Sequence, residues 1–462
     1  MPVVAVRVAI HDSESGGVRL DCGDRAVIDP RGTRQSSAVL AATLLLSACG
    51  HQTVDYAACH VVAPAHATRV NIISYPSPGM PFFGEQMAKC SSPPLLQIRH
   101  QMLPYEELAS QSTISLSSHG VSRYHVIHVS DNLLVEWSSK GWLAPLDELL
   151  KRYWTEYRLD EIPEAVWNAV RVNGHVYAVP ALQNTENLYY RKDVLAKYGL
   201  DVPRTFDELE HTCRLLKEKG AAEYPLVMMY SKSSEHFSLN FHDLLHSMGG
   251  RWFNDDGTPA FNDKAGQAAL TRMVVLYHAC MHPDTVNFTP EDAIIGLQQG
   301  QFVIGVMWMN AEPQVDDASA SKYAGRFGFA PAPAACSSCP PAGAWAIDSW
   351  VIPANSGVDR DLLFRIVMEG MKAANQVKAS ALTLVTRPAA ARAAASPYWA
   401  PGLAAIDRGA MALPRKPYTY LAVNALERYG MEALLGRMSV NEALNRAAEQ
   451  FSRSMHDEGF TK

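Results

Sequence analysis

Strand-like and helix-like apolar patterns alternate along the chain from residue 70 onward. Residues 70–75 (VNIISY) and 124–129 (YHVIHV) are short and rich in β-branched and aromatic residues, which predicts strands. The pattern at 132–139 predicts a helix, and from residue 421 to the end Leu, Ala and Met recur at three- and four-residue spacing, which predicts further helices. Strands that alternate with helices indicate an α/β fold with sheets of largely parallel character.

The segment before these elements has the pattern of an export signal. Residues 37–48 (SAVLAATLLLSA) form an apolar run behind two arginines, and the run is shorter than the roughly 20 residues that a membrane-spanning helix needs. It ends on the sequence LSAC, which resembles the lipobox of bacterial lipoproteins. We therefore predict a signal region over 1–48, a lipidated Cys49 and a tether over 49–69. An ordinary cleaved signal peptide is the alternative.

Composition narrows the class of protein. A chain of 462 residues with 48% hydrophobic and 19% charged residues can fold into two or three domains and is not disordered. The net charge of -6 argues against a nucleic-acid partner, because such proteins carry a basic face. Nine Trp and eighteen Tyr residues supply flat faces that can stack on sugar rings, although most are expected to pack in the core.

Two of the eight cysteines have a spacing that can be interpreted. Cys336 and Cys339 lie in a loop rich in Pro and Ala, and an exported protein can form disulfides, so we predict a small loop-closing bridge between them. A zinc ribbon would need a second Cys-x-x-Cys pair, which the sequence lacks. The prolines that follow disfavour the helix start of a redox motif.

A series of short motifs carries a resemblance to a known family. The motifs are HVSD at 128–131, KGWLAPLD at 140–147, NGHVYAVP at 173–180, LYYRKD at 188–193, PRTFDEL at 203–209, FHDLLHSMGG at 241–250, QQGQFVIGVMW at 298–308 and GAWAI at 343–347. In this order and spacing they resemble family 1 of the extracellular solute-binding proteins, closest to its maltose- and trehalose-binding members, over about residues 70–462. Within PRTFDEL, Thr205 and Glu208 also have the spacing of a helix capping box.

The resemblance implies a fold and a role. The fold would be a two-lobed periplasmic-binding-protein fold of type II character, with hinge strands and an interlobe ligand cleft. Lobe 1 would hold 70–180 and 343–385, and lobe 2 would hold 185–340 and 390–462 with the C-terminal helices. The protein would be the substrate-binding component of an ABC importer for a carbohydrate, with a disaccharide such as maltose or trehalose as the expected ligand.

The same resemblance implies the partners and the location. Two permease subunits and a cytoplasmic ATPase would receive the sugar. The protein would be a monomer in the periplasm or at the cell surface, held to the membrane by its lipid anchor. Neither a cofactor nor a metal nor enzymatic activity is expected.

Candidate ligand residues follow from the family's motifs and from the chemistry of sugars, which present hydroxyls at the ring edge and C–H groups on the faces. The candidates are Tyr75, Ser130, Asp131, Asn184, Glu186, Asp243, Trp308, Asn310, Gly343, Trp345 and Arg387. The two tryptophans are expected to stack on the sugar, and Asp131, Asn184, Asp243 and Arg387 to bond its hydroxyls. Either Ser130 or Asp131 can occupy the family's acidic position.

Three alternatives remain at this stage. A glycerol-3-phosphate or phosphodiester ligand would favour extra cationic groups. A metal-binding lipoprotein could use the i,i+4 pairs His242/His246 and His278/His282, although the first lacks the Glu of the zincin motif. A glycosidase would need two facing carboxylates, such as Asp131 and Asp243.

Overall fold

The computed structural model describes residues 59–231, 236–393, 396 and 398–461. The predicted signal region 1–48 and the predicted lipidation site Cys49 lie outside the described residues, as does the part of the predicted tether up to residue 58. Residues His60–Lys462 form one compact unit. Among the described helices, none combines the length and the apolar character that a membrane span requires.

The main sheet is mixed. Its strands lie in the order β2 (Leu96–Met102), β1 (Thr68–Ser74), β3 (Val126–Val129), β10 (Trp345–Val351), β6 (Ala178–Arg191), β8 (Ile304–Trp308) and β7 (Leu226–Met228). In addition, β9 (Phe327–Pro331) and β11 (Leu384–Val385) pair with β6, and β4 (Arg171–Val172) and β5 (His175–Val176) form a separate pair. The strands predicted at 70–75 and 124–129 are confirmed as β1 and β3.

Parallel pairing holds only toward the edges of this sheet. β1 is parallel to β2 and β3, and β7 is parallel to β8. In the centre β10 runs antiparallel to both β3 and β6, and β6 runs antiparallel to β8 and β9. The expectation of largely parallel sheets is therefore wrong for the central strands.

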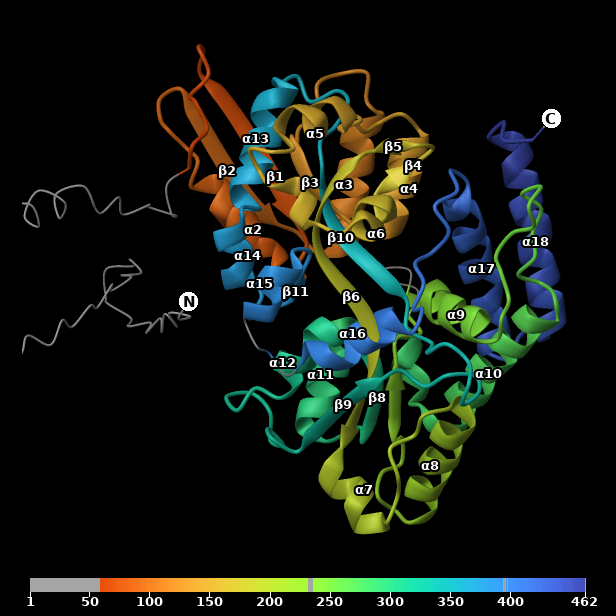
Figure 1. Cartoon of the computed structure of the whole chain (residues 1–462). Coiled ribbons are helices and arrows are strands. Elements are labelled where there is room, and N and C mark those ends of the chain that lie inside the picture. Colours follow the sequence, from red (N-terminus) through yellow and green to blue (C-terminus); the bar gives the residue numbers. More distant parts are fainter. Residues whose placement is uncertain (1–58, 232–235, 394–395, 397, 462) are drawn as a thin grey trace, which may run out of the picture. The chain divides into compact units, whose positions relative to one another are not determined.

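β6 is a 14-residue strand that belongs to two groups of strands. Its first half pairs with β10 and β11, and its second half, from Glu186 onward, pairs with β8 and β9 (Figure 1). The strand is buried almost throughout, yet its middle reads QNTEN over 183–187. Buried polar side chains need partners, so a polar run at the crossing point indicates a functional junction and not simple core packing.

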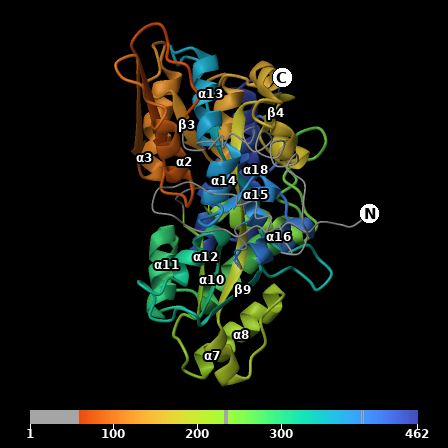
Figure 2. The same ribbon diagram turned by 60° about the vertical axis from the view of Figure 1, so that its left-hand side comes forward.

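Helices cover both groups of strands. They are α2 (Met80–Ala88), α3 (Tyr105–Ser117), α4 (Asp131–Ser139), α5 (Asp147–Tyr153), α6 (Glu164–Ala169), α7 (Lys192–Tyr198), α8 (Phe206–Glu218), α9 (His236–Ser247), α10 (Lys264–Cys280), α11 (Pro290–Gln299), α12 (Glu312–Val315), α13 (Arg360–Gly370), α14 (Ala373–Ala379), α15 (Pro388–Ala393), α16 (Trp399–Asp407), α17 (Thr419–Leu434) and α18 (Val440–Asp457). Short 3-10 helices span Leu159–Glu161, Pro283–Asn287 and Met309–Ala311. Figures 1 and 2 both show α13 beside α2, away from α7 and α8.

Local sequence signals set several helix starts. The capping box predicted at Thr205 and Glu208 is confirmed at the start of α8, where each side chain bonds the other residue's backbone N–H. Thr289 and Asp292 form a second capping box before α11, with Pro290 at the first helical position. These signals are short-range, so the sequence alone can place such helix starts.

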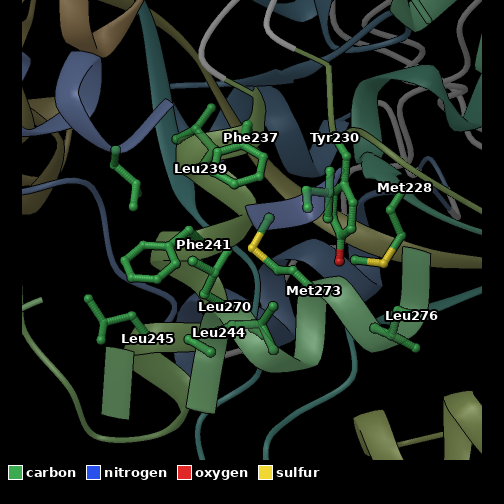
Figure 3. Close-up of a cluster of buried hydrophobic side chains, with 14 of the residues drawn as sticks. Met228, Tyr230, Phe237, Leu239, Phe241, Leu244, Leu245, Leu270, Met273 and Leu276 are labelled. Carbon is green, nitrogen blue, oxygen red and sulfur yellow. The ribbon is translucent and has the colours of Figure 1, made fainter. Parts of the chain in front are cut away.

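The largest described core cluster joins α8, α9, α10, β7 and the C-terminal helices α17 and α18. Figure 3 shows part of it, where Phe241 and Leu244 of α9 pack with Leu270 and Met273 of α10. Each fully buried side chain of this size contributes roughly 1.5–3 kcal/mol of transfer free energy. This core holds α9 in place, and α9 carries residues of the site described below.

One disulfide closes a loop and another links two helices of this core. Cys336 and Cys339 are joined in the loop between β9 and β10. Cys213 of α8 and Cys280 of α10 are joined over a separation of 67 residues. Their sequence spacing gave no indication of this second pairing, because it depends on two helices that pack side by side.

Candidate functional site

A cavity of about 640 Å³ lies where several strands end and several helices begin. Residues at or just after the carboxyl ends of β1, β2, β3 and β8 line it, together with residues from the first turns of α3, α4, α9 and α11. Crevices at the carboxyl ends of strands are the usual ligand sites of open α/β sheets. Because the lining comes from both groups of strands, the polar middle of β6 lies at this cavity.

The cavity brings together more than half of the residues expected from the sequence. Its lining includes Tyr75, Ser130, Asp131, Asn184, Trp308 and Asn310. The remaining candidates are not among its lining residues: Glu186, Asp243, Gly343, Trp345 and Arg387. The structure gives each of these five a different set of contacts, described below.

Asp131 is held in a fixed orientation at the cavity wall. Ser130 is the N-cap residue of α4, and Asp131 is the first residue of that helix. Both residues belong to the cavity lining, so the structure does not choose between them for the family's acidic position. The Arg415 guanidinium lies 2.6 Å from Oδ1 of Asp131. Burial raises the pKa of Asp131, and the charge of Arg415 opposes that rise.

A second carboxylate, Asp348, lies in the cavity wall on β10. Its Oδ1 accepts from the Tyr75 hydroxyl (2.5 Å) and lies 3.1 Å from Nε2 of His128. Its Oδ2 accepts from the Ser77 hydroxyl (3.0 Å). Burial would raise the pKa of Asp348, but the attraction of His128 and the hydrogen bonds outweigh burial and hold the pKa below its usual value.

Aromatic side chains reach the cavity from both groups of strands. Trp308, the last residue of β8, contributes a half-buried indole. Tyr75 and Tyr105 meet edge to face with ring centroids 5.1 Å apart, and the Tyr75 ring also stacks on His128 at 3.7 Å. Flat apolar faces beside carboxylates suit a ligand with apolar ring faces and a polar edge.

Asn184 and Asn310 lie at the crossing point of the two strand groups. The Asn184 side-chain oxygen accepts from its neighbour Thr185 N–H (3.1 Å) and from the Asn310 N–H (3.4 Å). The side-chain NH2 group of Asn184 can donate hydrogen bonds, whereas an ionised carboxylate in the cavity can only accept them.

Trp345 and Gly343 act in the packing around the cavity and are not part of its lining. The Trp345 indole N–H donates to the Gln183 side chain (3.3 Å). A Cβ on Gly343 would lie 2.8 Å from the Glu186 carbonyl oxygen and 2.8 Å from the Thr185 hydroxyl. The close approach of this segment to β6 therefore requires a glycine at position 343, and a ligand contact of Gly343 stays a prediction.

Glu186 and Asp243 form a buried carboxyl pair behind the cavity. Both are almost fully buried, and a side-chain hydrogen bond joins them. Burial raises the pKa of Glu186, and burial followed by the charge of Glu186 raises the pKa of Asp243. Two ionised carboxylates can only accept hydrogen bonds, so the pair holds a proton.

Arg387 contacts a part of the fold outside the cavity lining. Its guanidinium is buried, forms an ion pair with Glu161, and donates to the carbonyl oxygens of Tyr157 (2.7 Å) and Arg158 (2.8 Å). These contacts fix the segment between α5 and α6. The cation that reaches the cavity region is Arg415, which the sequence analysis did not single out.

The histidine pair considered for a metal has other partners. His242 Nδ1 accepts from the Trp252 indole N–H (3.0 Å), so its Nε2–H donates to the Met411 carbonyl oxygen (2.8 Å). His246 Nε2 donates in the same way to the Gly409 carbonyl oxygen (2.9 Å). Within the described part of the chain, no group of three or more His, Cys, Asp or Glu residues could hold a metal ion.

Several lining residues were missed from the sequence. Asp348 is a charged residue in the apolar strand WAIDSWV, and that mismatch was the available signal. Ser77 follows the first predicted strand directly, between two prolines. Tyr105, His236 and Glu291 begin helices whose direction toward the cavity only the packing decides.

Comparison with known proteins identifies what the chain is similar to. A sequence model of the family described as "Bacterial extracellular solute-binding protein" matches residues 103–357. The mannitol-binding protein of Pseudomonas aeruginosa is 24% identical over 397 residues, which cover 80% of this chain and 89% of that protein. The resemblance expected from the sequence motifs is thereby confirmed.

Solved structures give the same result at the level of the fold. The maltose-bound MalE3 protein of T. maritima superposes with a TM-score of 0.72 at 20% identity, covering 84% of this chain and 99% of the other. A solute-binding protein of Agrobacterium vitis with bound D-mannitol superposes with a TM-score of 0.71 at 21% identity, covering 85% and 99%. The expected two-lobed α/β binding-protein fold is confirmed.

Proposed function

The chain belongs to the bacterial extracellular solute-binding protein family, and from this membership we propose that it captures a neutral carbohydrate or sugar alcohol for an ABC importer. The family consists of solute-binding proteins, so the chain is a binding protein and not an enzyme. Within the family, the ligand class has to be argued from the site.

The observation that supports this ligand class is the combination of carboxylates and aromatic rings in one cavity. Asp131 and Asp348 offer acceptors for hydroxyls, and Trp308, Tyr75 and Tyr105 offer flat faces. Each of the two carboxylates already has polar partners from the protein, so the wall does not require a charged ligand. Buried sites of this kind reject ligands that leave their polar groups unpaired.

The exact ligand is part of the proposal. The sequence motifs favour a disaccharide such as maltose or trehalose, whereas the relatives bind maltose in one case and mannitol in others by their names. A cavity of about 640 Å³ falls within the range of roughly 300–1,000 Å³ common for small-molecule sites. We therefore propose a neutral polyhydroxylated molecule, either a sugar or a sugar alcohol.

The cellular setting is proposed with it. A lipid anchor at Cys49 would keep a monomeric protein at the outer side of the membrane, where two permease subunits with a cytoplasmic ATPase would take up the ligand. Mass spectrometry of the mature N-terminus tests the anchor, and the expected result is a diacylated cysteine that corresponds to Cys49. A free N-terminus elsewhere in this segment would contradict it.

A phosphorylated ligand fits the site less well. The charged side chains in the lining are mostly acidic, with Glu106 and Glu291 added to the two aspartates. The nearby cation Arg415 is paired with Asp131, and His128 lies against Asp348. A glycerol-3-phosphate site would need cationic or hydroxyl donors directed at the phosphate.

Thermal unfolding with candidate ligands tests the proposed function. We expect D-mannitol, ribitol, D-tagatose, maltose or trehalose to raise the Tm, because a ligand that binds only the native state adds about 2.7 kcal/mol at 100 times its Kd. Glycerol-3-phosphate should leave the Tm unchanged. A rise with glycerol-3-phosphate and none with the neutral compounds would reverse the assignment.

Tryptophan variants locate the binding event in the same experiment. Trp308→Ala should weaken binding of the active compound about tenfold or more, since it removes an aromatic face from the cavity. Trp154→Ala is the matched control, because Trp154 follows α5 and is 37% exposed outside the cavity lining. Equal loss in both variants would place the site elsewhere.

A further inference from the structure

Three polar side chains form one corner of the cavity, which we call the acceptor corner: Tyr75, Ser77 and Asp348. Tyr75 and Ser77 follow the carboxyl end of β1, and Asp348 comes from β10, more than 270 residues further along the chain. The two hydroxyls donate to the two oxygens of one carboxylate. The corner is therefore a built arrangement and not a chance meeting of surface groups.

The direction of these hydrogen bonds fixes what the corner can offer a ligand. An ionised carboxylate only accepts hydrogen bonds, so each hydroxyl must use its single hydrogen on Asp348. The pKa of Asp348 lies below its usual value because His128 and the two hydroxyls outweigh the effect of burial, so the group is ionised at neutral pH. The hydroxyl oxygens keep lone pairs as their remaining hydrogen-bonding capacity.

Asp348 itself retains capacity toward the cavity. A carboxylate has about four acceptor sites, and its oxygens meet Tyr75, Ser77 and His128. Its side chain is 14% exposed and belongs to the cavity lining. A register shift between Asp348 and Ser349 interrupts the pairing of β10 with β6, and such bulges redirect side chains. Ala346, Ile347 and Asp348, which directly precede this shift, all belong to the cavity lining.

We infer that the acceptor corner selects ligands by their hydrogen-bond donors, and that Asp348 accepts one ligand O–H group while the lone pairs of the Tyr75 and Ser77 hydroxyls accept from the adjacent one. This inference rests on the proposed function and names its specificity. A ligand group that can only accept, such as an ionised phosphate, an ether or a fluorine, meets a surface made of acceptors and is rejected. Neutral sugars and sugar alcohols with vicinal hydroxyls are accepted.

Calorimetric titration of the purified full chain tests the inference in two ways. The first compares D-mannitol, D-tagatose, maltose and trehalose, and then compares the compound that binds with its monodeoxyfluoro, mono-O-methyl and monophosphate analogues. At one or two positions, replacing the hydroxyl should weaken binding at least about tenfold for all three analogues, since each lacks the donor. Tolerance of methyl ethers or fluorine at every position would overturn the inference.

The second arm changes the protein. Asp348→Asn turns an acceptor into a donor at one oxygen and should weaken binding on the order of 10- to 100-fold, as expected for a lost hydrogen bond to a charged group. Ser77→Ala should weaken ligand binding by a smaller factor. This second variant still tests the inference if Asp348→Asn fails to fold. Asp361→Asn is the matched control, because Asp361 also accepts from a tyrosine and a cation, Tyr153 and Arg152, but outside the cavity lining.

The outcomes separate the inference from the proposed function. If the wild-type chain binds a neutral sugar or sugar alcohol and both cavity variants bind it equally well, the acceptor corner is not the specificity element and the proposed function stands. If the wild-type chain binds none of the neutral compounds, the proposed function fails and the inference fails with it. Loss of binding in the two cavity variants, with Asp361→Asn unchanged, supports both.

Discussion

At the scale of the residue, the buried carboxyls fall into two groups that differ in how their burial is compensated. Asp131 and Asp348 lie at the cavity, where Asp131 pairs with Arg415 and Asp348 contacts His128 and accepts from two hydroxyls. Glu186, Asp243 and Glu312 lie behind it and contact neutral groups or one another, as in the 2.6 Å bond from the Asn187 amide to Glu312. The charge of Arg415 opposes the effect of burial on the pKa of Asp131, and the contacts of Asp348 lower its pKa. In the second group burial raises the pKa values and favours the protonated form.

This difference predicts a pH dependence of stability. The pKa values of Glu186 and Asp243 are raised in the folded chain by burial, so the native state binds more protons than the unfolded state above the ordinary carboxyl range of about 4–4.5. Their contribution is therefore complete at lower pH and is lost as the pH rises through the raised values. In the wild-type chain the free energy of unfolding should fall above pH 5, with a slope of up to about 1.4 kcal/mol per pH unit for one proton. The Glu186→Gln variant should show a smaller slope.

Denaturant unfolding at several pH values measures this slope. Glu164→Gln, which alters an exposed carboxyl at the start of α6, is the control and should leave the slope as it is in the wild-type chain. His242 acts in the opposite sense, because burial lowers its pKa to about 4 and its contribution is lost as the pH falls from about 6.5 toward that value. A slope above pH 5 that Glu186→Gln leaves unchanged would show that the carboxyl pair is not its source.

At the scale of the element, two crossing strands determine where the cavity lies. β6 passes from one group of strands to the other, and β10 pairs with its first half while carrying Asp348. Just before β10, the chain passes so close to β6 that a Cβ at Gly343 would meet the Glu186 carbonyl oxygen at 2.8 Å. The packing of these two segments is therefore intolerant of added volume.

Gly343→Ala should destabilise the fold, because the atom it would meet is backbone and cannot rotate away. We expect a loss of about 1–3 kcal/mol, or a Tm lower by about 1–4 °C in a chain of this size. Gly120→Ala is the control, since the nearest atom to its added Cβ is the Ser118 hydroxyl at 4.0 Å, and its stability should change little. Thermal unfolding of both variants decides the point, and equal Tm values would contradict the close approach.

At the scale of the whole molecule, the cavity lining comes from both sides of the β6 crossing. The domain limits expected from the sequence, 70–180 with 343–385 and 185–340 with 390–462, remain a proposal. In that proposal a ligand held by Asp131 and Asp348 on one side and Trp308 on the other would bring the two halves together by hinge closure.

Small-angle X-ray scattering measures such closure directly. The radius of gyration of the chain should fall when a neutral sugar that raises the Tm is added at saturating concentration. A sugar that leaves the Tm unchanged is the control and should leave the radius of gyration unchanged. Equal radii with and without the active sugar would mean that the cavity binds without closure.

The sequence could predict those features that depend on neighbouring residues. The strands β1 and β3, the start of α4, the capping box at Thr205 and the α/β class all follow from local periodicity and from turn and cap chemistry. Ser130 and Asp131 were predicted because they end a predicted strand at the position of the ligand cleft in the family that the motifs resemble. The family was found from motifs in a fixed order, which does not require knowledge of contacts.

Only the tertiary structure decided which distant residues meet. Asp348 contacts Tyr75 and His128, and Arg415 pairs with Asp131 across 284 positions. Arg387 and Trp345 form their hydrogen bonds outside the cavity lining. These pairings depend on how β6 and β10 cross and on the register shift at Asp348, and no short-range pattern encodes them. The sequence thus determined which elements form and to which family the chain belongs, and the packing of those elements determined the site.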